Sequence, residues 1–213
     1  MDKKFSESAL AVIKTEAEAI NGLARQIGPD FEKVCRILFN CEGHIIVIGI
    51  GKSGHIGNKI AATLASTGSP AFFIHAAEAN HGDLGMINAK DVVLAISHSG
   101  ETDELITILP TLKLLQIPFI LLTGNTHSTL AQQATVTLTI SIDQEACPLG
   151  LAPTSSSTAA LVMGDAIAVS LLKARSFTCE DFAKVHPKGR LGRRLLLRVS
   201  DIMHKDTAIP RVT

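Results

Sequence analysis

The sequence predicts an α/β fold: a doubly wound, three-layer αβα sandwich around a five-stranded parallel sheet, with extra N- and C-terminal helices. Short β-rich apolar runs alternate along the chain with helical stretches, the order expected of βαβ units. Most of these runs are apolar on both faces, as strands are in a sheet that helices cover on both sides. With 46% hydrophobic residues, the chain has enough apolar side chains to bury such a sheet.

Two helices precede the first predicted strand. Residues 6–26 carry apolar side chains at helical spacing, and Ser6 or Ser8 is positioned to cap this helix. Residues 30–40 form the second predicted helix, which Asp30 opens. Helices of about a dozen residues fit between several of the following strands, as parallel crossovers require. The predicted strands are 44–49, 71–75, 91–97, 118–123 and 136–141.

Composition argues against several classes of function. Twenty basic and twenty acidic residues give a pI of about 7.1, without the broad positive surface of a nucleic-acid-binding protein. Without Trp and Tyr, a lectin-like stacking of sugar rings is disfavoured. The four cysteines form no CxxC pair, and neither a signal peptide nor an apolar run of about 18 residues is present. We therefore expect a cytoplasmic protein that binds a small molecule, with no membrane and no nucleic acid as partner.

A glycine-rich loop follows the first predicted strand. Residues 48–57 read IGIGKSGHIG, in which Gly49, Gly51 and Gly54 fit the G-x-G-x-x-G pattern of dinucleotide-binding loops. A P-loop that uses Lys52 would need a glycine at Ile46, so that motif is excluded. A dinucleotide loop expects an acid about 20 residues further on, and Glu78 lies somewhat late. The loop alone leaves three possibilities open: a dinucleotide site, another phosphate site, and a glycine-rich turn with a solvated lysine.

Two further helix starts carry clustered hydroxyl groups. After the third strand, residues 97–104 read SHSGETDE and expose Ser97 and Ser99, which helix capping would also explain. After the fifth strand, residues 154–158 supply five consecutive hydroxyl side chains, which exceeds the need of one cap and suits a phosphate. Ser128, after the fourth strand, is interpreted as a simple cap. Since parallel strands end at one edge of the sheet, these loops together predict a site for a phosphorylated small molecule.

Five segments carry a more specific signal: GIGKSGHIGNKIAATLASTG, EANHGDLG, SHSGETDE, EACPLGLAPTSSSTAALVMGDA and HPKGRLGRRLLLRVSDIM. In this order they resemble the sugar isomerase (SIS) domain family, and within it the branch of arabinose 5-phosphate isomerases, over about residues 40–204. The resemblance implies a flavodoxin-like sheet. It also implies an aldose–ketose isomerase that interconverts ribulose 5-phosphate and arabinose 5-phosphate through an enediol. The product would supply the sugar acid Kdo for lipopolysaccharide or capsule.

The resemblance further implies roles for individual residues. It places the catalytic groups on Lys52, Glu104, Glu145, His81 and His186. A metal-contacting histidine of the family matches His75, but this isomerisation needs no metal. No cofactor is therefore expected, and a zinc ion at His75 would inhibit rather than assist. Substrate contacts fall on Gly51, Ser53, Gly68, Ser69, His81, Ser97, Ser99, Thr102, Thr154, Ser155, Ser156 and Ser157.

The chemistry leaves some of these roles open. Moving a proton between C1 and C2 requires a base, a donor for the developing oxyanion and an anchor for the phosphate. Lys52 can supply the positive charge, and a histidine or a glutamate can transfer the proton. Which group is the base stays open, as does whether His186 acts in its own subunit or in a neighbouring one. Of the histidines without a role, which we interpret as surface or neighbouring residues, His98 is nearest the site.

The resemblance also predicts the domain organisation. Residues 1–198 would form the SIS domain, and 199–213 would open the first of a tandem pair of CBS domains, so the chain is expected to be truncated. The basic segment 184–198 suits phosphate attraction or a subunit contact, and family members are homotetramers. Two alternatives remain, namely a non-catalytic sugar-phosphate sensor and an isomerase of another sugar phosphate. The N-terminal forty residues are too short and too acidic for the DNA-binding domain that a sensor in a regulator would need.

Overall fold

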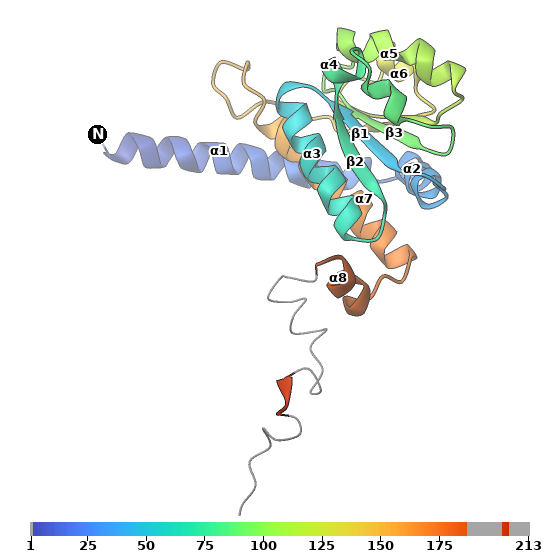
Figure 1. The fold of residues 1–213 in the computed structure, drawn as a ribbon. Coiled ribbons are helices and arrows are strands. Elements are labelled where there is room, and N and C mark those ends of the chain that lie inside the picture. The colour runs from blue at the N-terminus through green and yellow to red at the C-terminus, as the bar shows by residue number, and fades with distance from the viewer. Residues whose placement is uncertain (1, 187–201, 205–213) are drawn as a thin grey trace, which may run out of the picture.

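The computed structural model describes residues 2–186 and 202–204, and it confirms the predicted three-layer αβα sandwich (Figure 1). The helices are α1 (Asp2–Leu23), η1 (Ala24–Gln26), α2 (Pro29–Phe39), α3 (Gly51–Ser66), α4 (Ala76–Ala79), η2 (Asp83–Met86), α5 (Asp103–Leu114), α6 (Thr129–Gln133), α7 (Ser155–Ala174) and α8 (Cys179–Val185). The strands are β1 (Ile45–Gly49), β2 (Ala71–His75), β3 (Val92–Ile96), β4 (Phe119–Thr123) and β5 (Val136–Thr139).

All five strands are parallel and lie in the order β2-β1-β3-β4-β5, the flavodoxin-like order. The chain leaves β1 through α3 to reach β2 on one side, and it returns to the other side of β1 for β3. The direction of winding therefore reverses between β1 and β3. In open sheets of this kind, ligands bind outside the carboxyl ends of the strands at this switch point.

Alternate side chains of the strands build two separate cores. Ile45 and Val47 of β1 face the layer of α2, α3 and α7, while Ile46 and Ile48 face the layer of α4, α5 and α6. All four side chains are at most 1% exposed. Burial on both faces explains why the strands are continuous apolar runs instead of alternating ones.

The longest helix of the core, α7, packs closely against α3. A Cβ atom at Gly164 would lie 2.3 Å from Cδ1 of the buried Ile60, so this contact requires glycine. Within the described residues, α7 alone is long and apolar enough to cross a membrane by length and composition, and half of its apolar 18-residue stretch is buried inside the protein. Its packing against α1, α2 and α3 accounts for that apolar composition as that of a core helix.

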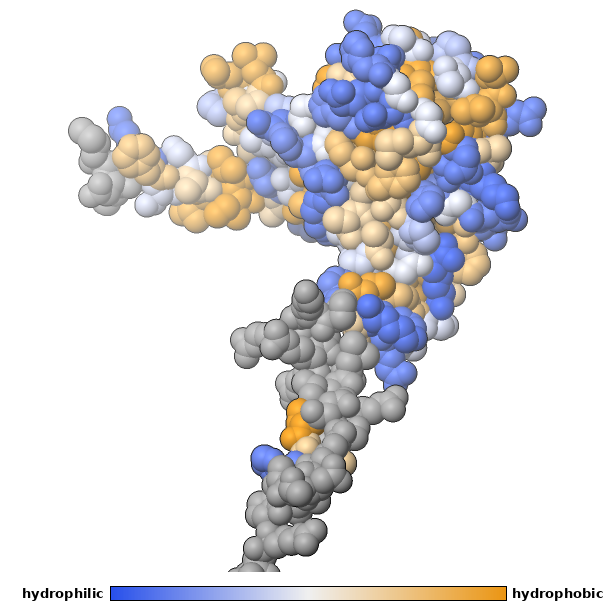
Figure 2. Space-filling model, in the orientation of Figure 1, coloured by the Kyte–Doolittle hydropathy of each residue, from blue (hydrophilic) through white to orange (hydrophobic). Residues whose placement is uncertain are grey.

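Helix α1 packs against α7 with its second half, and its first half projects from the body of the protein (Figure 1). Apolar side chains on the projecting half are exposed, including Phe5 at 74%, Leu10 at 66% and Ile13 at 65%. Figure 2 shows this apolar surface on the projecting helix and a second one on the loop between β5 and α7. The predicted cap at Ser6 or Ser8 is wrong, because the helix already begins at Asp2 and the Ser8 hydroxyl donates to the Lys4 carbonyl within it.

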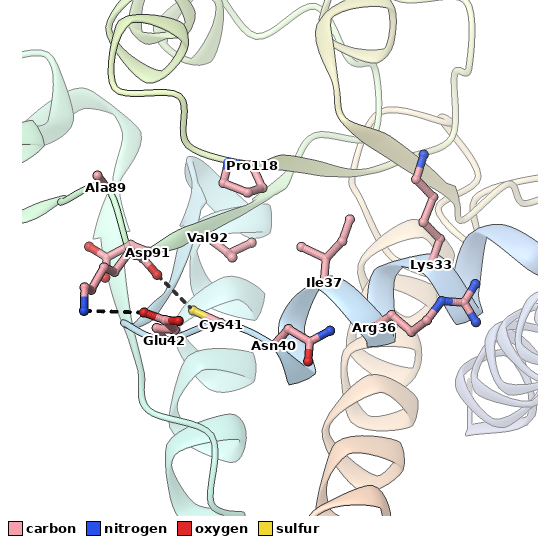
Figure 3. Close-up of a pocket in the computed structure, with 11 residues that line it drawn as sticks. Lys33, Arg36, Ile37, Asn40, Cys41, Glu42, Ala89, Asp91, Val92 and Pro118 are labelled. Atoms are coloured by element: carbon pink, nitrogen blue, oxygen red, sulfur yellow. Dashed lines mark hydrogen bonds and ion pairs between the residues drawn. The ribbon is translucent and has the colours of Figure 1, made fainter.

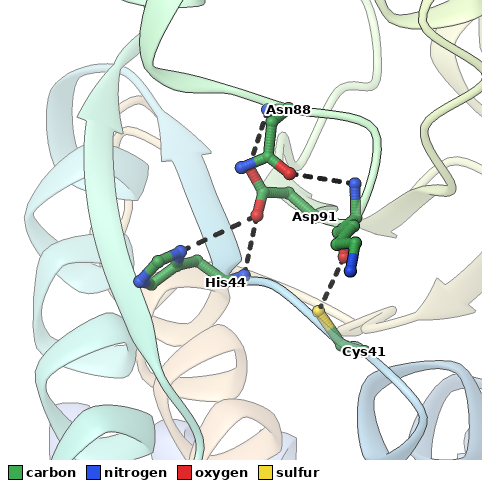
Figure 4. Close-up of polar contacts among 5 residues, drawn as sticks. Cys41, His44, Asn88 and Asp91 are labelled. Carbon is green, nitrogen blue, oxygen red and sulfur yellow. Dashed lines mark hydrogen bonds and ion pairs between the residues drawn. The ribbon is translucent and has the colours of Figure 1, made fainter.

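A buried aspartate joins the starts of the neighbouring strands β1 and β3 at the amino edge of the sheet (Figure 4). The side chain of Asp91 is fully buried. It accepts hydrogen bonds from the backbone N–H of His44 at 2.7 Å and of Asn88 at 2.8 Å. The residue at position 43 is glycine because a Cβ atom there would lie 2.2 Å from the Asp91 carboxylate. Asp91 thus holds the start of β3 against the start of β1.

We expect Asp91→Ala to lower the free energy of unfolding by about 3 kcal/mol, because two partly buried N–H donors lose a charged acceptor. Urea denaturation followed by circular dichroism measures this change. The matched control is Lys90→Ala, which removes only an exposed ion pair with Glu42 and should change the free energy by less than about 0.5 kcal/mol. Equal effects of the two substitutions would contradict the role of Asp91.

Candidate functional site

A cavity of about 280 Å³ opens at the carboxyl edge of the sheet, at the switch point between β1 and β3. The segments that follow β1, β3 and β5 form its walls, as expected from the positions of the clustered hydroxyl and glycine residues. Its lining consists of Ser53, Ile96, His98, Ile140, Glu145, Gly150, Leu151, Pro153, Ser156, Ser157 and Ala160.

The glycine-rich loop turns directly from β1 into α3. Gly51 has a φ of +57°, a left-handed conformation that favours glycine. Gly49 and Gly54 approach each other so closely that a Cβ atom on Gly54 would lie 3.1 Å from the Gly49 carbonyl oxygen. The glycines therefore serve the sharp turn, and the turn leaves Lys52 exposed in the first turn of α3 while the next residue, Ser53, lines the cavity.

The segment after β3 is held by hydrogen bonds among its own hydroxyl groups. Ser97 Oγ lies 2.7 Å from Thr102 Oγ1 and accepts from the Gly100 N–H at 3.0 Å. Ser99 Oγ accepts from the Glu101 N–H at 3.2 Å. The Ser97 hydroxyl is buried and shapes the loop, whereas Ser99 is exposed at the edge.

Glu145 occupies the start of α7, where the run of hydroxyl residues predicted a phosphate. One carboxylate oxygen accepts from the Thr154 N–H at 2.8 Å, from the Thr154 hydroxyl at 2.9 Å and from the Ser156 N–H at 3.3 Å. The Ser156 hydroxyl donates to the other oxygen. Ser157 donates to the Thr154 carbonyl at 2.9 Å, and Ser155 Oγ is buried without a partner among the described residues. Several hydroxyl groups of residues 154–158 are thus engaged in hydrogen bonds within the chain.

These contacts keep Glu145 ionised. Burial alone would raise the pKa of its carboxyl group, but the hydrogen bonds from Ser156 and Thr154 outweigh that effect and lower the pKa below its usual value. The carboxylate also lies at a helix N-terminus, where the helix dipole favours negative charge. Glu145 therefore brings a fixed negative charge to one wall of the cavity.

Glu104 and His81 belong to neighbouring segments beside this edge. The Asn80 side chain donates to the Glu104 carbonyl at 3.0 Å and to the Ala76 carbonyl at 3.0 Å, which ties the turn containing His81 to the start of α5. His81 is exposed and Glu104 is partly exposed, so both side chains are accessible. Neither residue lines the cavity itself.

His75 ends β2 and caps the short helix α4, because its Nδ1 accepts from the Ala77 N–H at 3.3 Å. In the part of the chain that the structure describes, no three His, Cys, Asp or Glu side chains form a group that could hold a metal ion. The role of His75 as a metal contact therefore stays a prediction.

Gly68 and Ser69 lie at the opposite edge of the sheet, because they precede β2 instead of following a strand. The Ser69 hydroxyl is 1% exposed and accepts from Arg175 Nε at 3.2 Å. Gly68 has a φ of +91°, and a Cβ atom there would lie 2.4 Å from the Phe177 ring. In this chain both residues contact the C-terminal end of α7 at the amino edge, away from the cavity, and their role as substrate contacts stays a prediction.

His186 is also remote from the cavity of its own chain. It follows α8, which lies beyond the C-terminal end of α7, whereas the cavity is at the N-terminal end (Figure 1). The imidazole stacks on the Phe182 ring at a centroid distance of 4.1 Å, and its Nδ1 lies 3.1 Å from the Phe182 carbonyl oxygen. The predicted CBS segment 199–213, apart from 202–204, and most of the basic segment 184–198 lie outside the described residues.

His98, which lies between Ser97 and Ser99 in the sequence, lines the cavity, although the sequence suggested no role for it. Its position directly after a parallel strand was the signal that could have identified it.

A larger cavity of about 530 Å³ lies at the amino edge, between α2 and the starts of β3 and β4 (Figure 3). Its lysines are already engaged, Lys33 with the Thr135 carbonyl and Lys90 with Glu42. None of the residues that the sequence predicted for the site lines it. The smaller cavity is therefore the candidate functional site.

The fold and this cavity define a doubly wound α/β protein with a small-molecule site at the switch point of its sheet. A SIS domain model matches residues 38–170, which is more than half of the chain. The chain therefore belongs to the SIS domain family.

Individual relatives agree with this membership. The arabinose 5-phosphate isomerases KdsD of Yersinia pestis and Pseudomonas aeruginosa are 56% and 57% identical to the chain over 98% of its length. The chain spans 64% of the length of each of these proteins. The structure of Escherichia coli CFT073 c3406 in complex with arabinose 5-phosphate is 41% identical, with a TM-score of 0.84, and the match covers 88% of this chain and 100% of that one.

The lowered pKa of Glu145 predicts a pH-dependent contribution to stability. The ionised carboxylate favours the folded state, so its contribution is complete above the ordinary glutamate pKa of about 4.3 and is lost as the pH falls through the lower folded value. We expect Glu145→Gln to lower the urea midpoint at pH 7. The difference in urea midpoint between this variant and wild type should become smaller below about pH 4. Asp143→Asn, at an exposed carboxylate two residues earlier, is the control and should leave the midpoint nearly unchanged. A difference in urea midpoint between Glu145→Gln and wild type that stays constant down to about pH 3 would contradict this role of Glu145.

Proposed function

We propose that the chain is an aldose–ketose isomerase that interconverts D-arabinose 5-phosphate and D-ribulose 5-phosphate. The observation that supports it most is that Ser53, His98 and Glu145, from the segments after β1, β3 and β5, line one small cavity at the switch point, with Lys52 next to Ser53 in the first turn of α3. The KdsD relatives and the c3406 complex with arabinose 5-phosphate support the choice of substrate. A cavity of about 280 Å³ suits a five-carbon sugar phosphate in its open-chain form.

The reaction moves a proton between C1 and C2 through an enediol. As the proton leaves carbon, negative charge develops on the neighbouring carbonyl oxygen, and a nearby cation lowers the barrier. Lys52 is assigned this role, because it is exposed in the first turn of α3 beside the cavity, and the helix N-terminus adds positive potential there.

The proton transfer itself is assigned to a group other than Glu145. A carboxylate that accepts four hydrogen bonds and has a lowered pKa is a weak base, so Glu145 instead holds the start of α7 and fixes the cavity wall. Glu104 and His81 are accessible beside the same edge and are the candidates for moving the proton. No metal ion or cofactor is assigned a step.

His186 is assigned to the cavity of a neighbouring copy, because α8 lies at the far end of α7 from its own cavity. The exposed apolar side chains of α1 and of the loop before α7, where Leu149 is 76% and Leu151 is 81% exposed, are the surfaces expected to pack between copies. We include a homotetramer in the proposal, as well as a cytoplasmic location, a CBS segment at 199–213 and supply of the product for Kdo.

The activity is tested by offering arabinose 5-phosphate, ribulose 5-phosphate and glucosamine 6-phosphate in parallel assays. We expect turnover of the two pentose phosphates, and a fall in kcat of about 10²- to 10³-fold for Lys52→Ala, because the developing oxyanion loses its cation. Lys59→Ala on the same helix removes a lysine that pairs with Asp165 away from the cavity, and it should retain wild-type activity. Absence of turnover with all three sugars would refute the enzyme, and near-normal rates for Lys52→Ala would refute the assigned role.

A complementation assay tests the assignment of His186. Lys52→Ala and His186→Ala should each be nearly inactive, but an equal mixture that exchanges subunits should regain about one quarter of the wild-type activity, because one site in four then has both residues intact. Light scattering should first give a mass of about four times the 22.6 kDa chain. A monomeric mass, or no recovery after proven exchange, would contradict the assignment.

A further inference from the structure

The larger cavity at the amino edge has no part in the proposed isomerase, but its lining has the composition of a ligand site (Figure 3). Cavities that bind small molecules combine apolar walls with a few polar groups, and their volumes are commonly about 300 to 1,000 Å³. Side chains of α2 form one wall of this cavity, and the starts of β3 and β4 form the other. Its volume of about 530 Å³ is nearly twice the 280 Å³ of the candidate site at the carboxyl edge.

One face of α2 brings two cations to this cavity. Lys33 and Arg36 are three residues apart, so they lie on the same side of the helix, and both are exposed. The Lys33 ammonium donates to the Thr135 carbonyl at 3.2 Å, which holds it in place and uses one of its three N–H donors. The Arg36 guanidinium, with five N–H donors, has no hydrogen-bond or ion-pair partner among the described residues. Most donors of the two cations are therefore available to an anion.

The acids that line the cavity lie at its other end. Figure 3 shows Asp91 and Glu42 on the side away from the two cations of α2. The Asp91 side chain is fully buried and accepts from two backbone N–H groups, and Glu42 pairs with Lys90 at 3.4 Å. Asp30 and Glu32, also on α2, do not line the cavity, and no ion pair joins them to its cations in the described part of the chain. An anion is therefore favoured at the α2 end of the cavity.

The middle of the cavity is apolar. Ile37 of α2, Val92 at the start of β3 and Pro118 before β4 line it, and Figure 3 shows them between the charged ends. Burial raises the pKa of the Cys41 thiol, so this side chain is neutral and extends the apolar surface. The Asn40 amide at the edge offers both a donor and an acceptor. A molecule that fills the cavity thus needs an anionic group joined to an apolar body with polar edges.

We propose that the amino-edge cavity binds a nucleoside monophosphate, with its phosphate on Lys33 and Arg36 and its base on the apolar middle of the cavity. A guanidinium group binds two phosphate oxygens at once, and the ring faces of a base are apolar while its edges are polar. A nucleoside monophosphate is a pentose phosphate with an added ring, which agrees with a volume nearly twice that of the candidate site. The inference does not rest on the proposed function, because the two cavities lie at opposite edges of the sheet.

Calorimetric titration of the chain with AMP tests this site. We expect one AMP per chain, bound about tenfold more tightly than inorganic phosphate, because the base adds apolar burial. Arg36→Ala should raise the Kd for AMP by about tenfold or more, because a charged pair of donors is lost. Arg25→Ala removes an exposed arginine outside the cavity and is the matched control, which should leave the Kd unchanged. Urea denaturation should give both variants the midpoint of wild type, which excludes damage to the fold.

Competition separates this site from the candidate site at the carboxyl edge. AMP should bind with the same Kd in the presence of excess arabinose 5-phosphate, and its displacement by the sugar phosphate would overturn the inference. Absence of AMP binding at millimolar concentration, or an unchanged Kd for Arg36→Ala, would overturn it equally. Equal affinity for AMP and inorganic phosphate would also overturn it, since the apolar middle would then contribute nothing. If the chain turned over no sugar, the isomerase would be refuted, and the comparison of Arg36→Ala with wild type would still decide this inference.

Discussion

The hydrogen bonds of one carboxylate determine how the candidate site is built. Glu145 arrives on the long loop after β5 and accepts hydrogen bonds from Thr154 and Ser156, which turns that loop back onto the first turn of α7. The loop then lines the cavity together with His98 and Ser53. Without that carboxylate, the start of α7 would expose unsatisfied N–H groups and the cavity would lose a wall. This wall of the cavity is therefore polar because Glu145, Thr154 and Ser156, which cap the start of α7, are polar.

The residues at the two edges of the sheet serve different purposes. Those at the amino edge stabilise the fold, and those at the carboxyl edge form the candidate site. At the amino edge, Asp91 joins the starts of β1 and β3, and Arg175 binds the end of α2 through the carbonyl oxygens of Leu38 and Phe39. At the carboxyl edge, the exposed groups Lys52 and Ser99 are supported by short, glycine-dependent turns. A rigid sheet between the edges lets such turns carry exposed polar groups without loss of the fold.

The sequence predicted the sheet well, since buried parallel strands give continuous apolar runs, and the cap at Ser128 is confirmed by its hydrogen bond from the Ala131 N–H. The helix cap at the N-terminus was wrong because Ser8 bonds within a helix that starts earlier. Tertiary contacts account for the remaining differences. Sequence spacing does not reveal that Glu145 engages the hydroxyl run, that Ser69 faces Arg175, or that α8 carries His186 away from the cavity. The close contact between the His98 ring and Gly124 is likewise not predictable from the sequence, because Gly124 follows a different strand.

The all-parallel sheet has a consequence for how the chain folds. No two neighbouring strands are joined by a hairpin, so each pairing requires a long connection to close first. Strand β1 pairs with β2 only after α3 has crossed over, and it pairs with β3 only after the chain has passed β2, α4 and η2. Contacts such as that of Asp91 with His44, which are 47 residues apart, therefore form late and slow the search for the native state. A ligand site assembled from the ends of these strands exists only once the whole sheet is complete.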